Sequence, residues 1–329
     1  MEPVKKVAIV NANSYARYFP EFIKKLEQEV GEVKRITVSP DIGAEELAEQ
    51  LKGYAYLVVG TTPVFSKNFF SKASSVKYIA RFGIGYNNVD VPGAREYGVL
   101  VSNVPGVLER EDVAEQAVAL VMALSKHVVD GSIAVHNNEW NVNRGRFLGN
   151  RLQDKTVGVL GYGNIGSAFG RIMARAFGCR ILAYDPYLTE EQIRERGAEK
   201  MDMDEVLSQS DIISLHINLT PETYHLISKE QLEKMKRSAL LINTARGALV
   251  DEHAVAKALE EEKLGGYGAD VTENEPVEID NPLLKSARCV ITPHLATYNW
   301  ECNHCMCQAV TDDVIRVSRG ELPRVVLER

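Results

Sequence analysis

The stretch from Thr156 to Gly166 reads TVGVLGYGNIG, and it decides the fold of this chain. The β-branched and aliphatic residues of Thr156–Leu160 predict a strand, and the pattern Gly-x-Gly-x-x-Gly follows directly. In this pattern Gly161 makes a tight turn, Gly163 lets backbone N–H groups approach a pyrophosphate, and Gly166 lets the next helix pack close to the strand. The start of that helix adds N–H donors and the positive end of its dipole. The stretch therefore predicts a dinucleotide-binding turn.

A second predicted strand, Ile181–Tyr184, ends in Asp185. A carboxylate at this place can accept hydrogen bonds from both ribose hydroxyls of NAD, and it would repel the 2′-phosphate of NADP. Pro186 and Tyr187 follow, so no Arg or Lys comes directly after the carboxylate to bind that phosphate. A packing turn with a surface Asp is the alternative interpretation. Strand, glycines, helix and carboxylate together favour NAD as the cofactor.

Short apolar runs, turns and helical stretches alternate along the rest of the chain, which predicts parallel sheets with right-handed crossovers. Two such series are separated by a helix from about Arg110 to Lys126, whose residues are apolar nearly all round and should be buried. A last helical pattern runs from about Trp300 to Arg319. The predicted strands are Lys6–Val10, Arg35–Val38, Tyr56–Val59, Tyr78–Arg81 and Leu100–Ser102, and then Thr156–Leu160, Ile181–Tyr184, Ile212–Leu215, Ala239–Ile242, Tyr267–Ala269 and Val290–Thr292.

The bulk composition is that of an ordinary globular protein. The 329 residues suffice for two domains, with 45% hydrophobic and 25% charged residues. A net charge of -7 argues against broad binding to nucleic acid or to an anionic membrane. The apolar stretch Val7–Val10 is too short for a signal peptide, and the longest apolar run, Ala117–Leu124, is too short to span a bilayer. We therefore expect a cytoplasmic protein with no nucleic-acid or membrane partner.

Three polar residues follow predicted strands of the second series: Arg246, Glu275 and His294. Alone, each is more often structural, but together they supply what reduction of a 2-oxo acid needs. A guanidinium binds a carboxylate through two hydrogen bonds, and an imidazole exchanges the hydroxyl proton near neutral pH. A carboxylate behind the imidazole fixes its tautomer. This scheme requires no metal.

The cysteines form no evident disulfide framework, because the chain has five and three of them, Cys302, Cys305 and Cys307, are crowded together. With His304 they could be interpreted as a metal or redox site. No second cluster completes four ligands, so we favour a helix with small buried side chains. On this helix Cys302 and Cys305 should share a face, from which Cys307 turns away.

Several segments resemble the D-isomer-specific 2-hydroxyacid dehydrogenase family, which includes phosphoglycerate, glyoxylate/hydroxypyruvate and D-lactate dehydrogenases. The resemblance covers essentially the whole chain. The segments that carry it are Tyr78–Val104, Gly158–Gly166, His216–Ile227, Asn243–Glu252, Ala269–Pro276 and Pro293–Ala296.

The resemblance implies roles for individual residues. His294 would be the acid/base, Glu275 would support it, and Arg246 would bind a small 2-hydroxy or 2-oxo acid. The implied NAD contacts are Gly161, Gly163, Asn164, Ile165, Gly166, Asp185, Ile217, Thr244, Asp270 and Thr297. The implied substrate contacts are Arg81, Gly83, Ile84, Gly85 and Arg246.

The resemblance also implies an architecture, in which a Rossmann NAD-binding domain (108–297) is inserted into a flavodoxin-like substrate domain (1–107 plus 298–329). Both domains would be doubly wound α/β folds with parallel sheets. The helix that begins near Arg110 would bridge subunits in a homodimer.

The sequence departs from the family pattern at two places. Arg81 matches an arginine of phosphoglycerate dehydrogenases, but their second phosphate-contacting arginine is Gly60 here, which argues against a phosphorylated substrate. After His294, Tyr298 and Trp300 are bulkier than the small residues common there, and they either shape the pocket or pack under the last helix.

Two alternatives share the scaffold. Formate dehydrogenases lack a glutamate at the place of Glu275, which disfavours that activity. An NAD(H)-sensing regulatory protein can keep the trio, so binding of the nucleotide without turnover would favour a sensor. Glyoxylate, hydroxypyruvate, a branched 2-oxo acid and a sugar-derived acid all stay open as substrates.

Overall fold

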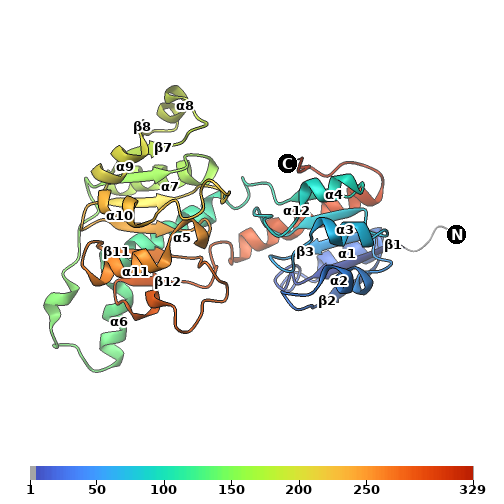
Figure 1. The fold of residues 1–329 in the computed structure, drawn as a ribbon, viewed down its shortest axis with the longest axis horizontal. Coiled ribbons are helices and arrows are strands. Elements are labelled where there is room, and N and C mark those ends of the chain that lie inside the picture. Colours follow the sequence, from blue (N-terminus) through green and yellow to red (C-terminus); the bar gives the residue numbers. More distant parts are fainter. Residues whose placement is uncertain (1–4, 329) are drawn as a thin grey trace. The chain divides into compact units, whose positions relative to one another are not determined.

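The protein is described by a computed structural model that covers residues 5–328. It divides into two compact units (Figure 1): unit 1 comprises Met1–Glu109 and Asn299–Arg329, and unit 2 comprises Arg110–Tyr298. The expected domain limits, at 107/108 and 297/298, lie next to these division points. Residues 1–4 and 329, which also belong to the expected limits and to the argument about a signal peptide, lie outside the described residues.

Unit 1 contains a parallel five-stranded sheet in the order β2-β1-β3-β4-β5. This is the strand order of flavodoxin-like doubly wound folds, as the resemblance implied. The strands are β1 (Lys5–Val10), β2 (Gly31–Ile36), β3 (Tyr56–Val59), β4 (Tyr78–Arg81) and β5 (Leu100–Asn103). The helices are α1 (Glu21–Glu29), α2 (Ala44–Gln50), α3 (Lys67–Lys72), α4 (Val91–Glu96) and α12 (Trp300–Ser318).

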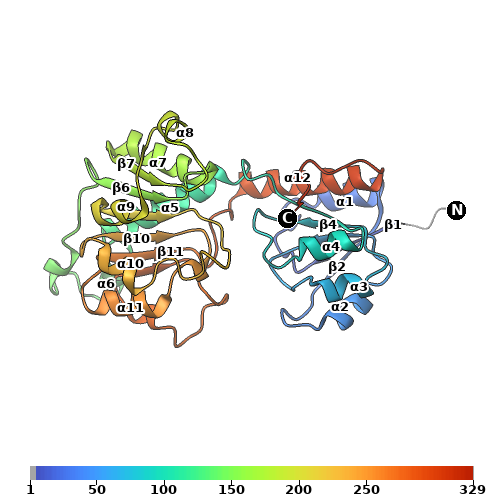
Figure 2. The ribbon, with the colours of Figure 1, turned by 45° about the horizontal axis from the view of Figure 1, so that its top comes forward.

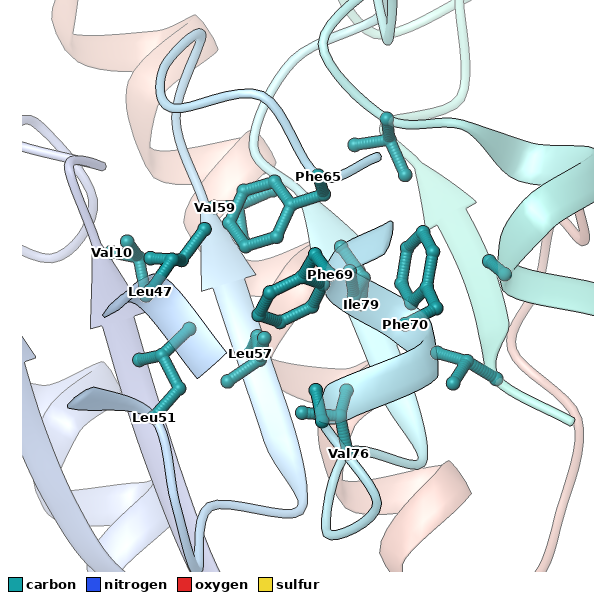
Figure 3. Close-up of a cluster of buried hydrophobic side chains, with 14 of the residues drawn as sticks. Val10, Leu47, Leu51, Leu57, Val59, Phe65, Phe69, Phe70, Val76 and Ile79 are labelled. Atoms are coloured by element: carbon teal, nitrogen blue, oxygen red, sulfur yellow. The ribbon is translucent and has the colours of Figure 1, made fainter. Parts of the chain in front are cut away.

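Each face of the unit 1 sheet has its own core. One core lies under α2, α3 and α4 and is filled by Phe65, Phe69 and Phe70 (Figure 3). The Ser66 side chain caps α3 by accepting a hydrogen bond from the Phe69 N–H, and this fixes where the helix begins. On the other face, α1 and α12 cover side chains from the central strands.

Strand β2 differs from the prediction Arg35–Val38. It begins earlier, because Gly31 pairs with Lys5 and the ladder continues to the pair Ile36–Val10. Beyond Ile36 the chain leaves the sheet, and the Val38 N–H donates instead to the Asn11 side chain. Strand β2 lies at the edge of the sheet, where Glu32, Lys34 and Arg35 are exposed and interrupt the apolar residues, so it does not form an apolar run.

Unit 2 contains a parallel seven-stranded sheet in the order β12-β11-β10-β9-β6-β7-β8. Read from β8, this is the Rossmann order with one strand added at the end. The strands are β6 (Thr156–Leu160), β7 (Arg180–Tyr184), β8 (Glu199–Lys200), β9 (Ile212–Leu215), β10 (Leu240–Asn243), β11 (Gly266–Ala269) and β12 (Cys289–Ile291).

Helices cover both faces of this sheet (Figure 2). The buried helix α5 packs on α7, β10 and β11, so it belongs to the core of unit 2. The helices of unit 2 are α5 (Arg110–Ser125), α6 (Val128–His136), α7 (Asn164–Phe177), α8 (Glu190–Glu195), α9 (Met203–Gln209), α10 (Lys229–Lys234) and α11 (Glu252–Glu260), with 3-10 turns η1 (Arg144–Phe147), η2 (Gly247–Leu249) and η3 (Pro282–Lys285).

The segment 128–148 carries many exposed apolar side chains, and we call it the apolar arm. Its exposed members are Val128, Val129, Ile133, Val135, Trp140, Val142 and Leu148. It contains α6, which the sequence analysis did not predict. Within the described residues no single helix is long and apolar enough to cross a bilayer; α5 and α6 meet that test only as a pair bent by 57°.

Candidate active site

The glycine-rich turn leads from β6 into α7, as the sequence predicted. Gly161 has φ of +89°, and a Cβ there would lie 2.5 Å from the His216 carbonyl oxygen, so only glycine fits. A Cβ on Gly166 would overlap the Gly161 carbonyl, which lets the helix approach the strand. Gly163 caps the helix and has open space beside it, since no atom of residues 5–328 lies within 4 Å of a Cβ position there. A phosphate at this place would have backbone N–H donors at the start of α7 and open space beside Gly163.

The turn lies at the topological switch point of the sheet. Strand β6 lies between β9 and β7, so successive crossovers depart in opposite directions from it. In open parallel sheets, ligands bind at the carboxyl ends of the strands at this point. The predicted cofactor residues gather there, because Gly161, Asp185, Ile217, Thr244 and Asp270 follow the ends of β6, β7, β9, β10 and β11.

Asp185 is fixed by the backbone around it. One carboxylate oxygen accepts the Tyr162 N–H at 2.9 Å, and the other accepts the Tyr187 N–H at 2.9 Å. The residue is 8% exposed, and each oxygen keeps a lone pair for a further donor. This geometry suits a ribose diol.

Other predicted contacts are also consistent with a dinucleotide. The Thr244 hydroxyl is buried, and it has no hydrogen-bond partner within the described part of the chain. A buried unpaired hydroxyl is costly unless a ligand supplies the partner. Asn164 and Ile165 form the first turn of α7, and Ile217 lies beside Gly161. These residues would hold the phosphates and the nucleoside parts of NAD.

Arg246 begins the turn after β10. The Asn243 side chain fixes this turn: its Nδ2 donates to the Arg246 carbonyl at 2.8 Å, and its Oδ1 accepts the Ala245 N–H at 3.0 Å. Next to Arg246, a Cβ on Gly247 would overlap the Thr272 backbone. The segment that carries Arg246 is therefore pressed against the loop that carries Glu275.

His294 and Glu275 form a pair, with 2.8 Å between Nδ1 and Oε2. Burial favours the neutral form of Glu275. However, the hydrogen bond and charge of His294, the Thr272 N–H and the charge of Arg246 outweigh it and hold the pKa of Glu275 below its usual range. Glu275 is therefore ionised at neutral pH. Its carboxylate accepts a hydrogen bond from the Nδ1–H of His294, so Nε2 is the ring nitrogen that this pair does not use.

The loop 292–297 holds His294 in a left-handed conformation, with φ of +54°. A non-glycine residue adopts this conformation only when its surroundings impose it. Here the buried Asp270 carboxylate accepts the Leu295 and Ala296 N–H groups, both at 2.8 Å. Asp270 is one of the residues predicted to contact the cofactor, and the contacts that the structure shows for it anchor the loop. Thr297 ends that loop, half-buried.

Sequence reasoning missed several residues behind the trio. Gln116 on α5 donates to the Thr292 hydroxyl at 2.9 Å and so supports Asp270 from the helix side. Glu252 and Glu273 each accept the other's backbone N–H, at 2.8 and 3.2 Å, and His225 contacts Glu273 at 3.1 Å. Gln116 could have been found as the polar residue beside the apolar stripe of α5.

A second strand-end histidine, His216, follows β9. Burial lowers the pKa of His216 to about 3, so its imidazole is neutral near pH 7. Its Nε2 lies 2.9 Å from the Ser214 hydroxyl. His216 is therefore a poor proton donor at neutral pH.

The predicted substrate residues Arg81, Gly83, Ile84 and Gly85 lie in unit 1, whereas the trio lies in unit 2. Arg81 ends β4, is 7% exposed and hydrogen-bonds the Phe82 carbonyl. Gly83 has φ of +126°, and the Arg81 guanidinium occupies the place of its missing side chain. The Ile84 carbonyl accepts the Asn103 amide at 2.6 Å, which fixes the turn.

The bulky residues after His294 have different places. Trp300 packs edge-on against Tyr18 and Phe19 within unit 1, and Tyr298 is half exposed in unit 2. The expectation for the cysteines was wrong in one respect: Cys302 and Cys307 are buried, and Cys305 is the exposed one. The buried face of α12 is wide enough to include both positions, since it packs on the sheet and on α1.

Comparison with known proteins identifies the family of this chain. The NAD-binding domain model of the D-isomer specific 2-hydroxyacid dehydrogenases matches residues 118–296. A glyoxylate reductase of Korarchaeum cryptofilum is 40% identical over 84% of this chain and 83% of its own length. A D-3-phosphoglycerate dehydrogenase of Methanocaldococcus jannaschii is 37% identical over 92% of this chain and 56% of its own length.

Among solved structures, a glyoxylate reductase from Paecilomyes thermophila superimposes with a TM-score of 0.84 at 32% identity, over 97% of each chain. Two parallel-sheet units, an NAD-binding turn at the switch point and these relatives lead to one conclusion. The chain belongs to the D-isomer specific 2-hydroxyacid dehydrogenase family, and its cofactor is NAD.

Proposed function

We propose that the protein transfers a hydride between NAD(H) and C2 of a small 2-hydroxy or 2-oxo acid. The observation that carries the proposal is the 2.8 Å contact between His294 and Glu275, at strand ends of the unit that binds NAD. The Glu275 carboxylate accepts a hydrogen bond from the Nδ1–H of His294 and orients the ring, so that Nε2 can donate a proton to a carbonyl oxygen.

In the proposed reduction, the bound nicotinamide supplies the hydride. Nε2 of His294 gives its proton to the oxygen at C2 as the carbonyl becomes a hydroxyl, and the reverse reaction returns that proton to Nε2. Glu275 keeps Nδ1 protonated and the ring oriented throughout. The Arg246 guanidinium binds the substrate carboxylate through two N–H donors. Arg81 and the turn Gly83–Gly85 are the further substrate contacts that we propose in unit 1.

The substrate that we favour is a small unphosphorylated 2-oxo acid of the glyoxylate type. Two observations support this choice. Relatives with matched length are named glyoxylate reductases. In addition, a Cβ on Gly60 would overlap the Asn11 carbonyl, so the place of the second phosphate-binding arginine has no room for any side chain.

We also propose that the protein is a homodimer. The apolar arm exposes seven large apolar side chains along residues 128–148. An apolar patch of this kind is typical of a protein interface. A second copy of the chain would cover it, and α5 lies directly before it in the chain.

The first prediction concerns His294. NADH should be oxidised by at least one acid in a panel of glyoxylate, hydroxypyruvate, branched 2-oxo acids and sugar-derived 2-oxo acids. His294→Ala should lower turnover about 100-fold or more, because general acid catalysis is lost, while NADH binding stays nearly unchanged. His253→Ala, an exposed histidine of α11, is the control. Tight NADH binding without turnover of any acid would point to a regulatory sensor instead.

The second prediction concerns pH. Glu275→Gln replaces the charged hydrogen-bond partner of His294 by a neutral amide, so the upper pH limit of 2-oxo acid reduction should fall. The pKa of Glu275 is lowered, so the wild-type carboxylate is charged at neutral pH and above. Glu278→Gln, in the same acidic loop, should leave the profile unchanged. An unshifted profile in Glu275→Gln would remove Glu275 from this role.

The third prediction concerns the choice of cofactor. Because Asp185 opposes a 2′-phosphate, NADH should bind at least tenfold more tightly than NADPH, a difference of about 1.4 kcal/mol. Titration of each nucleotide by fluorescence measures this ratio, and Asp185→Ala should reduce it. Equal affinity for both nucleotides in the wild type would contradict the assignment.

The fourth prediction concerns oligomeric state. Light scattering should give about twice the chain mass of 36.5 kDa. Ile133→Asp, which places a charge in the apolar arm, should shift the protein to monomers. Ile279→Asp is the control, because Ile279 is also exposed but lies outside the arm. A monomeric wild type at micromolar concentration would refute the dimer.

A further inference from the structure

We propose that Arg196 is a positioning residue for NAD: it orients the Gly163 N–H toward the pyrophosphate by holding the Tyr162 carbonyl. The proposal rests on NAD binding and does not depend on which acid is reduced. Arg196 follows the last residue of α8 and so lies outside the glycine-rich turn in sequence.

Two hydrogen bonds join Arg196 and Tyr162 in a reciprocal manner. The Arg196 guanidinium donates to the Tyr162 carbonyl at 2.8 Å. In return, the Tyr162 hydroxyl donates to the Arg196 carbonyl at 3.2 Å. Each residue therefore binds the other's backbone with its side chain, and the end of α8 is fastened to the turn.

Peptide planarity gives this contact a consequence for the ligand. The Tyr162 carbonyl and the Gly163 N–H belong to one trans peptide, so they point in opposite directions. Holding the oxygen toward Arg196 therefore turns the Gly163 N–H away from Arg196. Among the described residues, no atom lies within 4 Å of a Cβ position on Gly163, so this glycine leaves room for a ligand. Because glycine has wide conformational freedom, this peptide would otherwise rotate easily.

The preceding peptide is anchored as well. The Tyr162 N–H, which shares a plane with the Gly161 carbonyl, donates to Asp185 at 2.9 Å. Two consecutive peptides of the turn are thus anchored. Asp185 holds the Gly161–Tyr162 peptide by its N–H, and Arg196 holds the Tyr162–Gly163 peptide by its carbonyl. Loss of Arg196 would release the Tyr162–Gly163 peptide, while Asp185 would still hold the Gly161–Tyr162 peptide.

The Tyr162 ring provides a rigid support on which Arg196 can act. It is fully buried, and a Cβ on Gly170 would lie 2.8 Å from the tyrosine hydroxyl oxygen, so Gly170 makes room for it. Burial raises the pKa of Tyr162 to about 12, so the hydroxyl stays a neutral donor. Arg196, by contrast, is exposed, so its replacement leaves no cavity and the fold should be retained.

Other arginines provide a control for charge alone. Arg110, Arg171, Arg175 and Arg196 line one surface cavity of about 590 Å³ together with Glu111 and Glu195. If Arg196 acted only by attracting phosphate from this cavity, removal of another arginine there would have a similar effect. Arg175 is exposed, lines the same cavity and lies on α7, which makes it the matched control.

The experiment titrates NADH by fluorescence against the full chain, without any 2-oxo acid. Arg196→Met should raise the Kd about fivefold to tenfold, which is the effect of losing one charge-assisted hydrogen bond at an exposed site. Arg196→Lys should restore most of the affinity, because it keeps a charged donor. Arg175→Met should change the Kd by less than about twofold. An unchanged Kd in Arg196→Met, or an equal rise in Arg175→Met, overturns the proposal.

Competition by adenosine and ADP separates positioning from general damage. In Arg196→Met, ADP should compete more weakly, because its phosphates need the Gly163 N–H. Adenosine, which has no phosphate, should compete as it does with the wild type. Equal weakening of both competitors, or a lower unfolding temperature of the variant, would mean that Arg196 only supports the fold. None of these results depends on turnover, so a failure of the proposed reaction would leave this test intact.

Discussion

The hydrogen bonds of the buried Asp270 carboxylate are the contact on which the proposed site depends. This carboxylate is 1% exposed at the end of β11, and two backbone N–H groups of the following loop stabilise its charge. A buried carboxylate without such donors would be strongly destabilising, so the loop and the charge require each other. The loop in turn sets the left-handed conformation of His294. The conformation of His294 in turn places its Nδ1 within hydrogen-bond distance of Glu275.

Much of the fold could be predicted because parallel sheets bury strands on both faces. Buried strands appear as apolar or nearly apolar runs, as Tyr56–Val59 and Ile212–Leu215 do, and these two were predicted with their observed bounds. Strands at the edges escape this rule. Exposed charged residues interrupt the apolar residues of β2, and β8 has only two residues, both exposed. Neither offers a pattern that distinguishes it from a loop.

The site was predictable at the level of residue types at strand ends, and the resemblance supplied their roles. What the sequence could not provide is the set of contacts between loops that are far apart in the chain. Glu252 and Glu273 exchange backbone hydrogen bonds, yet nothing in either segment specifies the other. The same holds for Arg196 and the turn at Tyr162. Such pairs depend on tertiary geometry, which no local pattern encodes.

The insertion of unit 2 into unit 1 has a consequence for synthesis on the ribosome. Helix α12 buries Cys302, Met306, Cys307, Val310 and Val314 in the same core as Val7 and Ile9 of the first strand. All of residues 110–298 must be translated between the first strands and this helix. Translation proceeds at about 5–20 residues per second, so roughly 10–40 s pass before α12 is synthesised. During this time the apolar side chains that α12 later buries are not yet covered by it. Co-translational protection of that face is therefore a requirement that the order of the chain itself creates.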